Sequence, residues 1–109
     1  MIEKVHHIIL PVSDLKRAVS FYEKILGLNK TKEWPNFAIF DVGGVQFGLA
    51  PGEKVAVHLL IDDVDKAYRK FKEKGVKFIT EPKDQPFGER TATFVDPDGN
   101  IFAIEQLKK

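Results

Sequence analysis

An internal repeat is the feature that most restricts the fold of this 109-residue chain. Apolar residues spaced as one helix face in the first half recur 49 positions later (64 − 15 = 49): the matched pairs are Leu15 and Val64, Ala18 and Ala67, and Tyr22 and Phe71. Residues 47–49 (Phe-Gly-Leu) match residues 102–104 (Phe-Ala-Ile) at a spacing of 55 (102 − 47 = 55), so the second half holds six additional residues, which we expect within Glu81–Glu89. The chain is therefore an internal duplication: one domain, residues 1–109, with modules at residues 1–51 and 52–109.

Each half has the pattern of one strand, one helix and three further strands. Runs rich in β-branched and apolar residues predict strands at residues 4–12, 28–34, 37–42 and 45–50, and again at 55–61, 76–80, 91–95 and 101–107. The predicted helices begin at the N-cap candidates Ser13 or Asp14 and Asp62 or Asp63, and end before Gly27 and Gly75. Asp96–Gly99 is typical of a hairpin turn, because Pro fixes φ and Gly takes the left-handed conformation.

This order of elements predicts an α+β fold. A ferredoxin-like βαββαβ sandwich, which also duplicates βαβ units, is the alternative. It needs fewer strands between its helices, whereas residues 28–61 must hold four, with a hairpin turn at Gly43-Gly44. The strand count favours two modules of strand, helix and three strands.

Composition excludes several classes of partner. The net charge of +1 comes from 17 basic and 16 acidic residues in alternation, which argues against nucleic acid as a partner. The lysine-rich stretch 66–74 is interpreted as the solvated face of a helix. No run is long enough to cross a bilayer, so we expect no membrane partner and a cytoplasmic location. The absence of cysteine excludes disulfides, thiol nucleophiles and cysteine-bound metal.

Several short motifs together resemble the vicinal oxygen chelate superfamily, which contains glyoxalase I, extradiol dioxygenases and the bleomycin- and fosfomycin-resistance proteins. The motifs are Val12–Leu15, Phe21–Glu23 and Leu26–Leu28 in the first half, and Ile61–Val64, Gly75-Val76 and Thr93–Asn100 in the second. The resemblance spans nearly the whole chain. It implies two βαβββ modules whose curved mixed sheets form a cup around a cavity, in a homodimer.

The resemblance also indicates where a metal ion would be bound. Metal enzymes of this superfamily hold one divalent ion with His and carboxylate side chains from the first and last strands of each module. Those positions fall here on His7, Gly48, Ala56 and Ala103. One imidazole cannot hold such an ion alone, since these sites use three or more protein ligands. We therefore expect no metal there and no cofactor.

A different polar set is predicted on the inner faces of the sheets. Because side chains alternate along a strand, Gln46, His58 and Glu105 share a face with the metal positions two residues away. His58 and Glu105 each lie two residues beyond a metal position, Ala56 and Ala103, on strands expected to run parallel, so they should remain neighbours. They are the predicted catalytic pair for proton transfer. The alternatives are a purely structural hydrogen bond, an exposed Glu105, or a displaced metal site that also uses His7.

Four residues are predicted to contact a bound ligand: His7, Trp34, Gln46 and Arg90. Trp34 could form an aromatic wall of the ligand site, and the alternative for this residue is core or dimer packing. Arg90 could bind an anionic group of the ligand, and the alternative is that it only solvates the start of a strand. His6 should face away from His7 and lie on the surface.

The combined prediction is a protein that binds a small organic molecule, as the bleomycin-resistance branch does. The alternative is a lyase, isomerase or dioxygenase that uses His58 and Glu105. A structural or regulatory dimer is a third class. The sequence does not identify the ligand.

Overall fold

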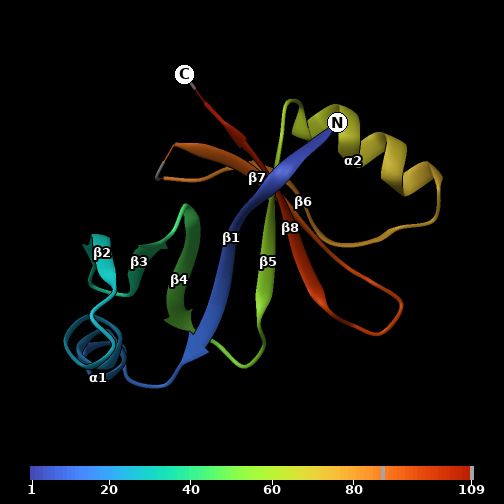
Figure 1. The fold of residues 1–109 in the computed structure, drawn as a ribbon. Helices are drawn as coiled ribbons and strands as arrows, with labels where there is room; N and C mark the ends of the chain where they lie inside the picture. The colour runs from blue at the N-terminus through green and yellow to red at the C-terminus, as the bar shows by residue number, and fades with distance from the viewer. Residues whose placement is uncertain (87, 109) are drawn as a thin grey trace. The chain divides into compact units, whose positions relative to one another are not determined.

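The computed structural model describes residues 1–86 and 88–108. Within them the chain forms an α+β fold of eight strands, two α-helices and one π-helical turn (Figure 1). The elements are β1 (Ile2–Val12), α1 (Leu15–Ser20), η1 (Phe21–Ile25), β2 (Asn29–Trp34), β3 (Phe37–Val42), β4 (Val45–Pro51), β5 (Ala56–Ile61), α2 (Val64–Glu73), β6 (Lys77–Asp84), β7 (Glu89–Val95) and β8 (Ile101–Leu107). The predicted fold class and the repeated order of elements are confirmed. In the described part of the chain, no helix has the length and apolarity needed to span a bilayer.

The chain divides into two compact units. The N-terminal unit is His7–Val55, and the C-terminal unit combines Met1–His6 with the residues from Ala56 onward. Strand β1 therefore contributes to both units.

The two units have the same sheet topology. In the N-terminal unit the strand order is β2-β3-β4-β1, and in the C-terminal unit it is β5-β8-β7-β6. The first and last strands of each repeat pair in parallel, β1 with β4 and β5 with β8, and the other pairs are antiparallel.

The helix of the N-terminal unit packs on β3 and β4. Its N-cap is Asp14, whose side chain accepts a hydrogen bond from the Arg17 N–H at 3.1 Å. The buried core consists of Val19, Ala38, Phe40 and Leu49. The sequence predicted one continuous α-helix, but the chain changes to a π-helical turn at Phe21, where the Leu26 N–H reaches the Phe21 carbonyl at 3.0 Å.

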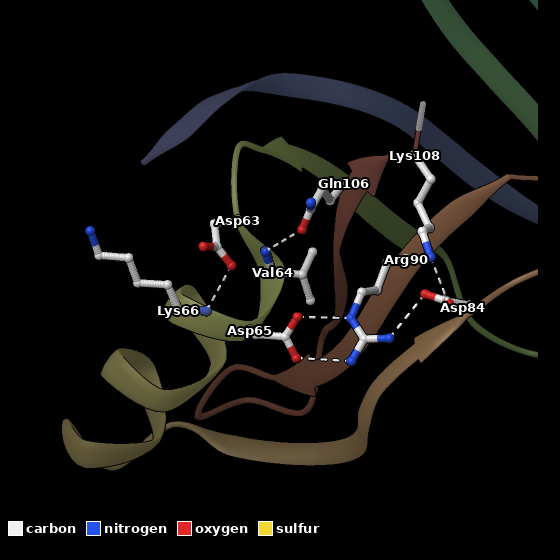
Figure 2. Close-up of polar contacts among 8 residues, drawn as sticks. All are labelled: Asp63, Val64, Asp65, Lys66, Asp84, Arg90, Gln106 and Lys108. Carbon is white, nitrogen blue, oxygen red and sulfur yellow. Dashed lines mark hydrogen bonds and ion pairs between the residues drawn. The ribbon is translucent and has the colours of Figure 1, made fainter.

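Helix α2 is fixed to the sheet of the C-terminal unit at its N-terminus. Asp63 is the N-cap and accepts from the Lys66 N–H at 3.0 Å, and the Gln106 amide oxygen accepts from the Val64 N–H at 2.9 Å (Figure 2). The apolar face of the helix buries Val64 and Ala67 in a cluster completed by Ile61, Ala92 and Ile104. Because Gln106 and Ile104 both lie toward α2, the residues that alternate with them on β8 face the other way.

The loop expected within Glu81–Glu89 is shorter than predicted, because both flanking strands extend into this range. Strand β6 continues to Asp84 and β7 begins at Glu89; Phe87 lies outside the described residues. The register of β6 against β7 shifts twice, between Phe78 and Thr80 and between Thr80 and Lys83. Each of these two shifts places one additional residue in β6 relative to β7.

The predicted turn between β7 and β8 is confirmed. The Asp96 carboxylate accepts hydrogen bonds from the backbone N–H of Asp98 and from both the backbone and side-chain nitrogens of Asn100, at 2.8–3.0 Å. Gly99 has φ +84°, a conformation that a residue with a Cβ rarely adopts. The hydrogen bonds from Asn100 lower the pKa of Asp96.

Candidate functional site

The candidate site centres on Glu105, a carboxylate with no solvent exposure in the C-terminal unit. Glu105 lies on the face of β8 opposite the one that packs against α2. In the parallel β5–β8 pair it stands across from Leu60, and His58 stands across from Ala103. His58 is therefore diagonal to Glu105 on the same face of the sheet.

Two imidazoles meet this carboxylate. The His58 Nδ1 bonds to Glu105 Oε1, and the His6 Nδ1 lies 3.1 Å from Glu105 Oε2. The side chain of His58 is 28% exposed and that of His6 12%, so a molecule at this face reaches His58 more easily than either of the other two. A buried carboxylate requires strong hydrogen bonds or positive charge to offset its lost hydration, and the two ring nitrogens supply hydrogen-bond donors.

The prediction for His6 is wrong. Strict alternation along β1 placed His6 on the surface, opposite His7. In the structure Met1–His6 belong to the C-terminal unit and His7 to the N-terminal unit, so adjacent residues of one strand serve different units. Alternation alone does not show which unit each part of a shared strand joins.

In the N-terminal unit, His7 and Gln46 form a second polar pair. The His7 Nε2 lies 3.1 Å from the Gln46 Oε1, and His7 is buried. The β1–β4 register, with Ile8 across from Phe47, places the two side chains next to each other on one face. Both were predicted to contact a ligand, and the structure brings them together.

Trp34, Phe37 and Ile9 form an apolar surface near Gly48. Trp34 and Phe37 are paired residues of β2 and β3, with ring centroids 5.5 Å apart, and Trp34 remains 38% exposed. Lys32 Nζ lies 6.0 Å from the Trp34 ring centroid. The space beside Gly48 is filled: a Cβ at this position would lie 2.5 Å from Ile9 Cδ1 and 3.0 Å from Phe37 Cζ.

Arg90, which was predicted to bind an anionic group, pairs with two protein carboxylates. Its Nε and Nη2 donate to the two oxygens of Asp65 at 2.8 and 2.9 Å, and its Nη1 donates to Asp84 at 2.9 Å (Figure 2). Lys108 binds the other oxygen of Asp84 at 2.7 Å. Arg90 lowers the pKa of Asp65, and Lys108 and Arg90 lower the pKa of Asp84. This network joins α2 to β6 and β7.

Comparison with known proteins identifies the family. The profile of the Glyoxalase/Bleomycin resistance protein/Dioxygenase superfamily matches residues 4–104. The chain belongs to this superfamily. It is 31% identical to the uncharacterized protein YraH of Bacillus subtilis (strain 168), over 95% of this chain and 98% of YraH. It is 25% identical to the metallothiol transferase FosB of Lysinibacillus sphaericus (strain C3-41), over 93% of this chain and 80% of FosB.

Solved structures share the fold at lower identity. A methylmalonyl-CoA epimerase from Mycobacterium tuberculosis has a TM-score of 0.82 at 18% identity, over 99% of this chain and 90% of the epimerase. A superfamily member from Vibrio splendidus 12B01 has a TM-score of 0.76 at 21% identity, over 98% and 99% of the two chains. These likenesses establish the architecture.

The superfamily's metal position does not fit a metal ion in this chain. Gly48, Ala56 and Ala103 have no side-chain donor, and Ile9 and Phe37 occupy the space beside Gly48 that a ligand side chain would need. The side chains that meet at Glu105 in the C-terminal unit include His6 and His58, both with ring nitrogens that can bind a metal ion. The predicted alternative of a displaced metal site used His7 with His58 and Glu105 and omitted His6.

Proposed function

We propose that the protein binds a small organic molecule and transfers a proton on it, with His58 as the general base and Glu105 as its supporting carboxylate. The observation that carries this proposal is a fully buried carboxylate bonded to an imidazole that remains partly exposed. This arrangement supports the alternative that the sequence left open, an enzyme that is a lyase, isomerase or dioxygenase, and proton transfer fits the first two of these classes.

The chemistry follows from which ring nitrogen meets Glu105. A neutral His58 that donates its Nδ1–H to the carboxylate has its lone pair on Nε2, which can accept a proton from a substrate. The imidazolium that forms is stabilised by the adjacent negative charge, and the same ring can return the proton at another position. The candidate proton is one on the carbon next to a carbonyl group: when Nε2 takes it, the electron pair of the broken C–H bond passes to the carbonyl oxygen as an enolate, and the proton is then returned from the imidazolium.

The test is proton exchange in D₂O. Methylmalonyl-CoA is the first substrate to try, because an epimerase acting on it shares this fold, followed by other acyl thioesters and α-hydroxy ketones. We expect deuterium incorporation by mass spectrometry with the unmodified protein, and a loss of ~10²-fold or more in His58→Ala and His58→Gln. Lys70→Arg is the control, since it keeps the charge of an exposed side chain on α2, which packs against the face of the sheet opposite Glu105. Exchange that survives both His58 variants would exclude His58 as the base.

Sequestration without chemistry is the second candidate, favoured by the apolar surface of Trp34, Phe37 and Ile9 in the N-terminal unit. Trp34 is the single tryptophan, so its fluorescence reports directly on this surface. Under this alternative a planar aromatic cation should quench the Trp34 emission saturably, and His58→Ala should leave the affinity nearly unchanged. Saturable quenching together with absent proton exchange would favour sequestration over the enzyme.

A further inference from the structure

Glu105 has an imidazole partner on each of its oxygens, and only one of them is explained by the proposed chemistry. His58 bonds to Oε1. His6, which lies on β1, has its Nδ1 3.1 Å from Oε2. His6 is less exposed than His58, at 12% against 28% of the side chain. It is therefore placed to act on the carboxylate and poorly placed to touch a substrate directly.

We propose that His6 is a positioning residue: it holds the Glu105 carboxylate in the orientation that keeps His58 in its Nδ1–H tautomer. This inference rests on the proposed function for its effect on catalysis, but its structural part can be measured without any substrate.

The physical basis is the donor and acceptor pattern around one carboxylate. An ionised carboxylate only accepts hydrogen bonds, so a ring nitrogen that faces it must carry a proton. Both Nδ1 atoms face Glu105 oxygens, which assigns the Nδ1–H tautomer to His6 and to His58. The two donors hold opposite ends of the same group. Removing the His6 donor takes away one of the contacts that fix the rotation of the carboxylate about its Cγ–Cδ bond, and so weakens its alignment with His58.

The location of the donor atom makes the proposal specific. Asparagine places its side-chain nitrogen near the position of a histidine Nδ1, whereas glutamine extends it toward the position of Nε2. His6→Asn should therefore preserve the bond to Oε2, His6→Gln should preserve it poorly, and His6→Ala should remove it. If His6 contributed only side-chain volume or polarity, the His6→Asn and His6→Gln variants would not differ in this way.

The experiment is long-range ¹H–¹⁵N NMR on protein with ¹⁵N-labelled histidine, which distinguishes the two tautomers of each neutral ring. We expect His58 as the Nδ1–H form in the unmodified protein and in His6→Asn. In His6→Ala and His6→Gln its signal should shift toward the Nε2–H form. In the exchange assay His6→Ala should lower kcat about 10-fold or more with little change in KM, as loss of an orienting partner does, and His6→Asn should restore it.

Two results would overturn the inference: a His58 ring that is Nε2–H in the unmodified protein, or a His58 tautomer that is the same in all three His6 variants. If the His6→Ala protein does not fold, the difference in His58 tautomer between His6→Asn and His6→Gln is sufficient to test the inference. If proton exchange is absent with every substrate while the tautomers behave as expected, the proposed function fails and the role of His6 stands.

Discussion

Replacing Gly48 by alanine tests the claim that the superfamily's metal position is physically filled in this chain. The alanine Cβ would lie 2.5 Å from Ile9 Cδ1, and 3.0 and 3.1 Å from Phe37 Cζ and Cε1. Favourable carbon–carbon contacts lie near 3.5–4.0 Å, so the Ile9 methyl must move by about 1 Å and the Phe37 ring by roughly half that. Gly48 has a φ that alanine can adopt, since it is not among the positive-φ glycines of the structure.

The expected effect is the balance of two terms. Turning the Ile9 side chain by ~30° or more costs about 0.5–1.5 kcal/mol, and overpacking of a filled core costs about 1–3 kcal/mol in total. Against this, alanine reduces the conformational entropy of the unfolded chain, which stabilises by about 0.4–1 kcal/mol. We expect Gly48→Ala to lower the free energy of unfolding by about 1 kcal/mol, or about 4 °C in Tm for a domain of this size.

A double-mutant cycle identifies the cause. Ile9→Val removes the Cδ1 atom that the new Cβ meets and by itself costs about 0.5–1.5 kcal/mol. In the Ile9→Val background, Gly48→Ala should be close to neutral, which corresponds to a coupling energy of about 1 kcal/mol. Urea unfolding of the four proteins at one fixed protein concentration supplies the values, because association would otherwise change the midpoints.

Either of two outcomes would refute the reasoning. If Gly48→Ala is stabilising, the space beside Gly48 is open and a ligand side chain could enter it. If Gly48→Ala destabilises equally with and without the Ile9 Cδ1 atom, the strain lies elsewhere, and Ile9 does not block the position.

Acid, salt and protein concentration supply three further tests. Hydrogen bonds lower the pKa of Asp96 below its ordinary 3.8, so their stabilisation is complete above that pH and is lost as the pH falls through the lowered pKa. Asp96→Asn should flatten the dependence of the urea midpoint on pH below about pH 4; an unchanged slope would contradict this. Arg90→Lys should lower the urea midpoint at low salt by an amount that shrinks in ~1 M NaCl, because the bidentate pair with Asp65 is partly exposed, whereas a salt-independent loss would point to packing. Sedimentation at micromolar concentration should show a homodimer, whose interface we expect to bury at least roughly 1,000 Å²; monomer alone would exclude it.

The sequence by itself determined the fold class, because repeated local signals agree with one another. The helix faces recur 49 residues apart, Asp14 and Asp63 supply matching N-caps, and Asp96 and Gly99 have the residue types that their turn requires. Alternation along the last strand likewise placed Glu105 on the inner face predicted for His58. These inferences need only neighbours along the chain, since periods of 2 and 3.6 residues set which side chains share a face.

Tertiary structure decided the partners of the polar side chains. That His6 meets Glu105, and that Arg90 pairs with Asp65, depends on which strand or helix packs beside each residue. Gly48 shows the same limit. The sequence shows that this position has no side chain to bind a metal ion, but only the packing shows that Ile9 and Phe37 lie in the space beside it. Contacts between residues distant in sequence are made by the tertiary fold, and the alternation of side chains along one strand does not predict them. For this reason the sequence could name His58 and Glu105 as a pair but could not name His6 as their third member.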